Sequence, residues 1–119
     1  MYSPQVLDHF EHPRNAGELP DASARVQVEN PVCGDVLEFS VKVDGGIITA
    51  ARFRARGCVA SVACASRLTE MVLGASIAEA EKIDREALVE SLDGLPEGSA
   101  HAGHLAIDAL SAALDQIQK

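Results

Sequence analysis

Apolar and polar residues alternate with a period of two along two neighbouring stretches of the chain, residues 36–43 and 47–55. Such alternation is typical of β-strands with one buried and one exposed face. Asp44-Gly45-Gly46 lies between the two stretches and indicates a hairpin turn, because glycine adopts positive φ at little cost. The pattern therefore predicts an antiparallel hairpin. The residues expected on its buried face are Leu37, Phe39, Val41, Val43, Ile47, Thr49, Ala51, Phe53 and Ala55.

Outside this hairpin the apolar residues recur every three to four positions, which predicts helices. A first helix begins at Ser3-Pro4, a favourable start, and ends at Pro13. Its apolar stripe is expected to consist of Val6, Leu7 and Phe10. Further helices are expected at about residues 60–73, 76–82, 84–92 and 103–118, and a short strand around Val26 and Val28. The fold class that follows is α+β, a small three-stranded antiparallel sheet packed against helices.

Composition narrows the possible functions. The 119 residues fit a single domain, residues 1–119. A net charge of −8, from 18 acidic and 10 basic residues, argues against a nucleic-acid partner or an anionic membrane surface. The N-terminus has no basic region followed by an apolar run, so we expect a cytoplasmic protein. Disulfides are rare in that compartment, and the three cysteines are therefore candidates for metal binding or sulfur chemistry.

Two of these cysteines lie at the same end of the predicted hairpin. Cys33 precedes the first strand in a turn, and Asp35 follows it closely, whereas Cys58 lies where the second strand gives way to a helix. Since the hairpin runs out and back, these residues are expected to lie close together. The helix start favours the thiolate form of Cys58. His101 and His104 could complete a site for zinc or an iron–sulfur centre.

Each candidate ligand also has a simpler explanation. A free cysteine often packs as a small apolar residue, which is our interpretation of Cys64 between two alanines. Asp35 could only cap its turn, and His101 or His104 could be surface residues at a helix start. His9 and His12 are interpreted as solvated helix residues. The row Arg52, Arg54 and Arg56 is either a solvated strand face or a docking stripe for an acidic partner.

Several segments resemble a known family, the IscU or NifU N-terminal scaffolds of iron–sulfur cluster assembly. The matching segments are Asp8-His9-Phe10, Pro13-Arg14-Asn15-Ala16-Gly17, Asn30-Pro31-Val32-Cys33-Gly34-Asp35, Gly57-Cys58-Val59-Ala60-Ser61, Thr69-Glu70 and His101 through Leu110. The resemblance covers about residues 2–117 and implies an IscU/SufE-like fold. It also implies that Cys33, Asp35, Cys58 and His101 hold a [2Fe–2S] cluster, iron or zinc, and the position of His104 makes it a further candidate ligand.

The resemblance further implies a function and partners. The expected protein is not an enzyme but a scaffold or carrier, which receives sulfur from a cysteine desulfurase and passes a cluster to acceptor apoproteins. The family has a third cysteine directly after the histidine, where this chain has Ala102. An alternative is therefore a zinc-binding or persulfide-accepting protein without full scaffold activity. A structural interaction protein with a relic site is the remaining possibility.

Overall fold

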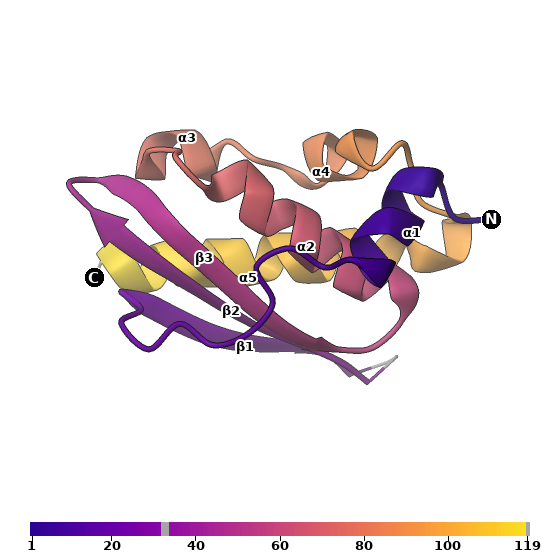
Figure 1. Ribbon diagram of the computed structural model, residues 1–119, viewed down its shortest axis with the longest axis horizontal. Coiled ribbons are helices and arrows are strands. Elements are labelled where there is room, and N and C mark those ends of the chain that lie inside the picture. Colours follow the sequence, from indigo (N-terminus) through magenta and orange to yellow (C-terminus); the bar gives the residue numbers. More distant parts are fainter. Residues whose placement is uncertain (32–33, 119) are drawn as a thin grey trace.

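The computed structural model describes residues 1–31 and 34–118, and its centre is a three-stranded antiparallel sheet of order β1-β2-β3 (Figure 1). The strands are β1 (Ala24–Asn30), β2 (Asp35–Asp44) and β3 (Ile47–Arg56). The register pairs Phe39 with Val26 on one side and with Phe53 on the other. The predicted hairpin, the additional strand and the α+β fold class are thus confirmed.

Helices pack on one face of this sheet (Figure 1). Their bounds are α1 Pro4–Glu11, α2 Val59–Val72, α3 Ile77–Glu81, α4 Arg85–Ser91, the 3-10 helix η1 Glu97–Ser99, and α5 Ala100–Gln118. α2 lies against β3 and α5, and α5 lies against β1 and β2. α5 begins before the predicted residue 103, so that His101 stands in its first turn rather than ahead of it.

The core forms between the sheet and α2 and α5. Leu37, Phe39 and Val41 supply its large side chains from the central strand and are at most 1 % exposed. The helices meet them largely with small residues, among them Ala63, Ala65, Ala102, Ala106, Ala109 and Ala113. Such small side chains allow α2 and α5 to approach both each other and the sheet closely. This close approach brings the start of α2 and the start of α5 to the same end of the sheet.

The buried face of β3 differs from the prediction at one end. Lys42 pairs with Ala50 but Val43 pairs with Ile48, so Thr49 is an extra residue that forms a β-bulge. The alternation therefore changes phase, and Ile48 is buried whereas Ile47 and Thr49 are exposed. Assigning Ile47 and Thr49 to the buried face was wrong, because a strict period of two does not reveal a bulge.

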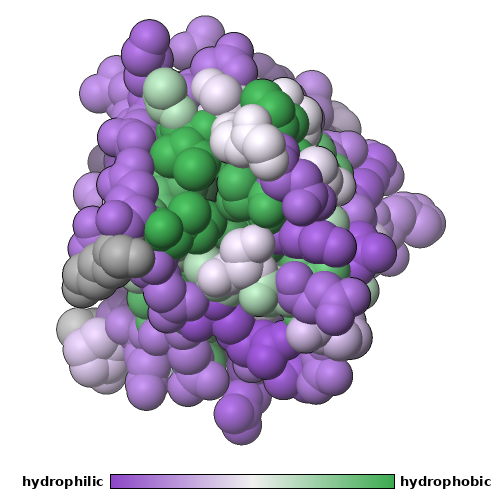
Figure 2. Space-filling model, turned by 90° about the vertical axis from the view of Figure 1, so that its left-hand side faces the viewer, coloured by the Kyte–Doolittle hydropathy of each residue, from purple (hydrophilic) through white to green (hydrophobic). Residues whose placement is uncertain are grey.

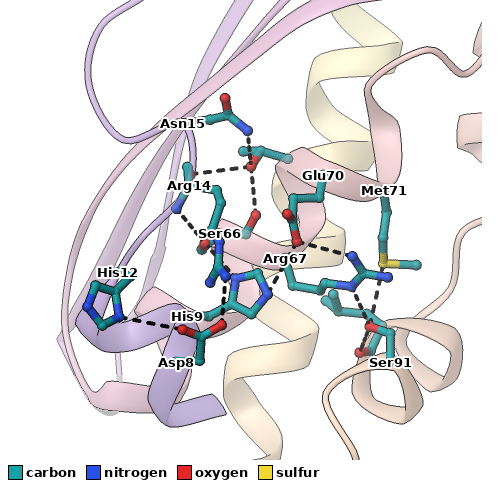
Figure 3. A network of polar contacts seen from close by, with 12 residues as sticks. Asp8, His9, His12, Arg14, Asn15, Ser66, Arg67, Glu70, Met71 and Ser91 are labelled. Atoms are coloured by element: carbon teal, nitrogen blue, oxygen red, sulfur yellow. Dashed lines mark hydrogen bonds and ion pairs between the residues drawn. The ribbon is translucent and has the colours of Figure 1, made fainter. Parts of the chain in front are cut away.

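The buried face of α1 was also predicted incorrectly. Val6 is buried, but Leu7 and Phe10 are 41 % and 39 % exposed, and His9 is buried in their place. His9 Nδ1 lies 2.7 Å from Ser66 Oγ, which also accepts a hydrogen bond from the Arg14 backbone N–H (Figure 3). On the other side of the ring, His9 Nε2 lies 3.3 Å from Glu70 Oε1. His9 is therefore a structural link between α1 and α2, not a solvated residue.

The two ends of the molecule differ in character. Apolar side chains gather on the end that carries the β2–β3 turn and the C-terminus of α5 (Figure 2). A hollow between α3 and α5 at this end has both apolar and polar lining residues, which are Ala80, Ile83, Leu110, Leu114, Glu81, Ser111, Asp115 and Gln118. The opposite end holds the start of α2 and the start of α5 (Figure 1).

Within residues 1–31 and 34–118, no helix has the length and apolar character needed to cross a membrane.

Candidate metal centre

The junction between β3 and α2 positions the first two groups of the candidate site. Cys58 is the N-cap residue of α2, and its thiol is partly exposed. Asp35, the first residue of β2, lies beside this junction because Val36 pairs with Arg56. Its side chain is buried, with the residue 4 % exposed. Gly57 makes this approach possible, since a Cβ atom there would lie 2.5 Å from Asp35 Oδ1.

His101 reaches the same point from the first turn of α5. Its Nε2 lies 3.2 Å from Asp35 Oδ2 and 3.7 Å from Cys58 Sγ. The third side of this triangle, from Cys58 Sγ to Asp35 Oδ2, is 3.7 Å. Zinc–ligand bonds of about 2.0–2.3 Å at tetrahedral angles place ligand atoms about 3.3–3.8 Å apart. The three atoms are therefore spaced like one face of a tetrahedral metal site.

Among the described residues, Asp35, Cys58 and His101 form the group of metal-ligating side chains that meets at one point. The prediction that these three residues cluster agrees with the structure. Asp35 does more than cap its turn, because its carboxylate faces Cys58, His101 and α2. Cys33 lies outside the described residues, and its place in the site stays a prediction from the sequence.

A fourth residue of the cluster, Ser61, was missed in the sequence. Its hydroxyl donates a 2.6 Å hydrogen bond to Asp35 Oδ2 and lies 3.4 Å from Cys58 Sγ. The residue is buried, at 4 % exposure. The signal that could have found it is the spacing from Cys58, because residues three apart in a helix lie on the same side.

The other sulfur and imidazole candidates lie apart from the cluster. His104 is exposed on the next turn of α5 and is not part of the group around Asp35. Cys64 is fully buried in the core, where burial raises the pKa of its thiol to about 12, so core packing is confirmed. Ala102, at the position where a third cysteine was expected from the resemblance, is buried at 1 % exposure.

The arginine row on β3 makes contacts within the chain. Arg54 forms 3.0 Å ion pairs with Glu18 and with Glu38, which raise the pKa of its guanidinium further. Arg52 donates a 3.0 Å hydrogen bond to Asn15 Oδ1. These contacts tie the segment after α1 to the sheet, and they explain two of the three arginines without a docking partner.

A thiol, a carboxylate and an imidazole thus converge at one end of a three-stranded sheet covered by helices, which defines a small α+β protein with a candidate mixed-ligand metal site. The sequence pattern of the NifU-like N terminal domain matches residues 1–119. The protein belongs to this family, as its motifs indicated.

Relatives with assigned roles support the same membership. The chain is 46 % identical over 114 residues to the iron–sulfur cluster assembly scaffold protein IscU 1 of Archaeoglobus fulgidus, covering 96 % of this chain and 74 % of the relative. It is 42 % identical over 117 residues to the IscU scaffold protein of Escherichia coli, covering 95 % and 91 %. The predicted family resemblance is therefore confirmed.

Solved structures show the same fold. A NifU-like N-terminal protein from Brucella abortus superimposes with a TM-score of 0.78 at 20 % identity, covering 98 % of this chain and 93 % of the other. A cluster assembly scaffold protein for the SUF system from Fervidobacterium islandicum gives a TM-score of 0.76 at 21 % identity, covering 95 % and 96 %. At these identities the likeness concerns the fold alone.

Proposed function

We propose that this protein is a scaffold for iron–sulfur cluster assembly, which binds iron or a [2Fe–2S] cluster as its cargo and passes it to acceptor apoproteins. The observation that carries the proposal is the triangle of Asp35, Cys58 and His101, whose ligand atoms lie 3.2–3.7 Å apart. Residues 1–119 act together as one unit in this proposal, with Cys33 as the fourth protein ligand.

The mixed ligand set suits a protein that releases its cluster better than one that retains the cluster permanently. Thiolates bind the irons of iron–sulfur clusters strongly, whereas a carboxylate oxygen is a harder and weaker ligand for them. Asp35 is therefore the ligand that yields most readily to a thiolate of an acceptor protein. No bond of an organic substrate is broken in this role, which is that of a carrier and not of an enzyme.

The position of Cys58 supports a cysteine desulfurase as the sulfur donor. As the N-cap residue of α2, Cys58 is partly exposed, so a donor protein can reach its sulfur. The Cys58 thiolate would attack the outer sulfur of a persulfide on the donor, forming a persulfide on Cys58. The donor cysteine would leave as a thiolate, so that atoms and electrons balance.

Anaerobic reconstitution with ferrous iron and sulfide tests the proposal. The wild-type protein should develop the visible absorption of an iron–sulfur centre, and Cys33→Ser and Cys58→Ser should each abolish it. Cys64→Ala is the matched control, because Cys64 is fully buried away from the cluster, and it should retain the absorption. If the Cys33→Ser and Cys58→Ser variants developed the same absorption as the wild-type protein, the proposal would be contradicted.

A zinc-binding or persulfide-accepting protein is the second candidate function. Ala102 cannot supply a thiol, and the triangle around Asp35 has the spacing of one tetrahedral ion. Two thiolates, one carboxylate and one imidazole would form a complete zinc site. Stoichiometric zinc binding with no cluster after reconstitution would favour this candidate, and mass spectrometry after incubation with a desulfurase would detect sulfur on Cys58.

A further inference from the structure

We propose that Ser61 is a positioning residue of the metal site, which holds the Asp35 carboxylate in place for the cation. This inference rests on the proposed function, since it assigns a role to Ser61 within the same site. The carrying observation is the 2.6 Å hydrogen bond from Ser61 Oγ to Asp35 Oδ2, the oxygen that also faces Cys58 Sγ and His101 Nε2.

The carboxylate is restrained on two sides. Asp35 Oδ1 lies against Gly57, where a Cβ atom would be only 2.5 Å away, and Asp35 Oδ2 is held by Ser61. Ser61 itself is buried in the first turn of α2. The helix backbone therefore fixes the position from which its hydroxyl reaches Asp35. The carboxylate is thereby oriented toward Cys58 and His101 before any cation arrives.

The hydroxyl also contacts the sulfur ligand, at 3.4 Å from Cys58 Sγ. A hydroxyl carries one proton and can accept through its lone pairs. While it donates to Asp35 Oδ2, it can accept from the Cys58 thiol and hold that thiol beside the carboxylate. Ser61 therefore links two ligands that come from different elements, β2 and the start of α2.

Groups that hydrogen-bond to metal ligands fix the orientation of those ligands, and their loss typically costs 10–100-fold in metal affinity. A serine that merely packs in the core would have no such effect on the metal. The expected consequence of Ser61→Ala is therefore a roughly 10–100-fold weaker affinity for a divalent cation, with the ligand set unchanged.

Titration of the metal-free protein with Co²⁺ tests this, because cobalt bound to a thiolate has a charge-transfer absorption that reports both the affinity and the ligation by cysteine thiolates. S61A should weaken binding and keep the thiolate band. S111A is the matched control, since Ser111 is exposed on α5 at the other end of the molecule, and it should bind like the wild type.

A double-mutant cycle separates a role through Asp35 from a general effect on the fold. In a D35A background the S61A substitution should change the Co²⁺ affinity less than twofold. An equal loss in both backgrounds, or S61A binding like the wild type, would overturn the inference. If S61A does not fold, S61T serves as the test, because it keeps the hydroxyl. Weakened Co²⁺ binding by a folded S61T would overturn the inference as well. A wild-type protein that binds no Co²⁺ would instead refute the proposed metal site itself.

Discussion

Gly57 matters for the space that it leaves and not for its backbone conformation. Replacing it with alanine should push the Asp35 carboxylate out of its place, because the new Cβ would lie 2.5 Å from Asp35 Oδ1. We predict a roughly 10–100-fold loss of affinity for Zn²⁺, measured by competition with a chromophoric chelator. Gly98→Ala is the matched control, because no atom lies within 4 Å of its Cβ position. Equal losses in the two variants would contradict this role of Gly57.

The two described cysteines should differ sharply in reactivity. Cys64 is buried and its thiol pKa is raised to about 12, so almost none of it is thiolate at pH 8. Cys58 is partly exposed at the start of α2. We predict that iodoacetamide modifies Cys58 in the folded protein and modifies Cys64 only in urea. Peptide mapping by mass spectrometry measures this, and rapid native modification of Cys64 would contradict it.

Candidate ligands could be predicted residue by residue where topology alone determines their place. Asp35 and Cys58 bracket a hairpin, and a hairpin necessarily brings its ends together. His101 required the packing of α5 against the sheet, for which the sequence offers only the amphipathic pattern. Ser61 was missed because its spacing from Cys58 places it only on the same side of α2. Its role depends on the Asp35 carboxylate of β2 lying beside that side, which the spacing does not reveal.

Elements were predicted more reliably than the faces they bury. The hairpin and the helices follow from periodicity, but the bulge at Thr49 shifts the phase of β3, and nothing in the alternation marks it. On α1, His9 is buried instead of Leu7 and Phe10 because Ser66 and Glu70 on α2 satisfy both ring nitrogens. Such partners lie more than fifty residues away in the chain, beyond the reach of a local pattern.

The contact between α1 and α2 should depend on pH through His9. Burial, with Arg14 and Arg67 nearby, lowers the pKa of His9 below 6.5 despite the opposing charges of Glu70 and Asp8. The unfolded chain therefore binds more protons than the folded one just below pH 6.5, and stability falls as the pH decreases through that range. We predict that His9→Gln, which cannot be protonated, flattens the difference in unfolding free energy between pH 7.5 and 5.5.

Urea denaturation at the two pH values measures this difference. His104→Gln is the matched control, because His104 is exposed on α5, away from the contact between α1 and α2, and it should keep the wild-type pH dependence. Asp8 and Glu79, whose pKa values are lowered from 3.8 and 4.5, contribute stability that is lost only at more acid pH. If His9→Gln kept the wild-type pH dependence of the unfolding free energy, groups other than His9 would determine it, and the prediction would be wrong.

Loss of Ser66 should destabilise the same contact at neutral pH. Its hydroxyl bonds to His9 Nδ1 and accepts from the Arg14 backbone N–H, both in a largely buried setting (Figure 3). Ser66→Ala leaves these two groups without that partner, and a cost of about 1–3 kcal/mol in unfolding free energy is expected. Urea denaturation measures it against Ser111→Ala, an exposed serine on α5. A Ser66→Ala protein as stable as this control would contradict the structural role.

At the scale of the whole molecule, the proposed metal site joins segments that are distant in sequence. Asp35 and His101 are 66 residues apart, and Cys58 and His101 are 43 apart. The unfolded chain does not bring these ligands together, so a cation that they share binds the folded state preferentially. Metal binding at the proposed site should therefore be coupled to folding, and the site should contribute to stability only when it is loaded.

This coupling gives a prediction in which two histidines of one helix serve as test and control. For an ion that binds only the folded state, Zn²⁺ at 100 times its dissociation constant should raise the unfolding free energy by about 2.7 kcal/mol, and a chelator should reverse the gain. His101→Ala should lose most of this gain because Nε2 is one corner of the ligand triangle. His104→Ala should keep it, since His104 is exposed one turn further along α5. If zinc stabilised both variants equally, the ion would be bound elsewhere on the protein.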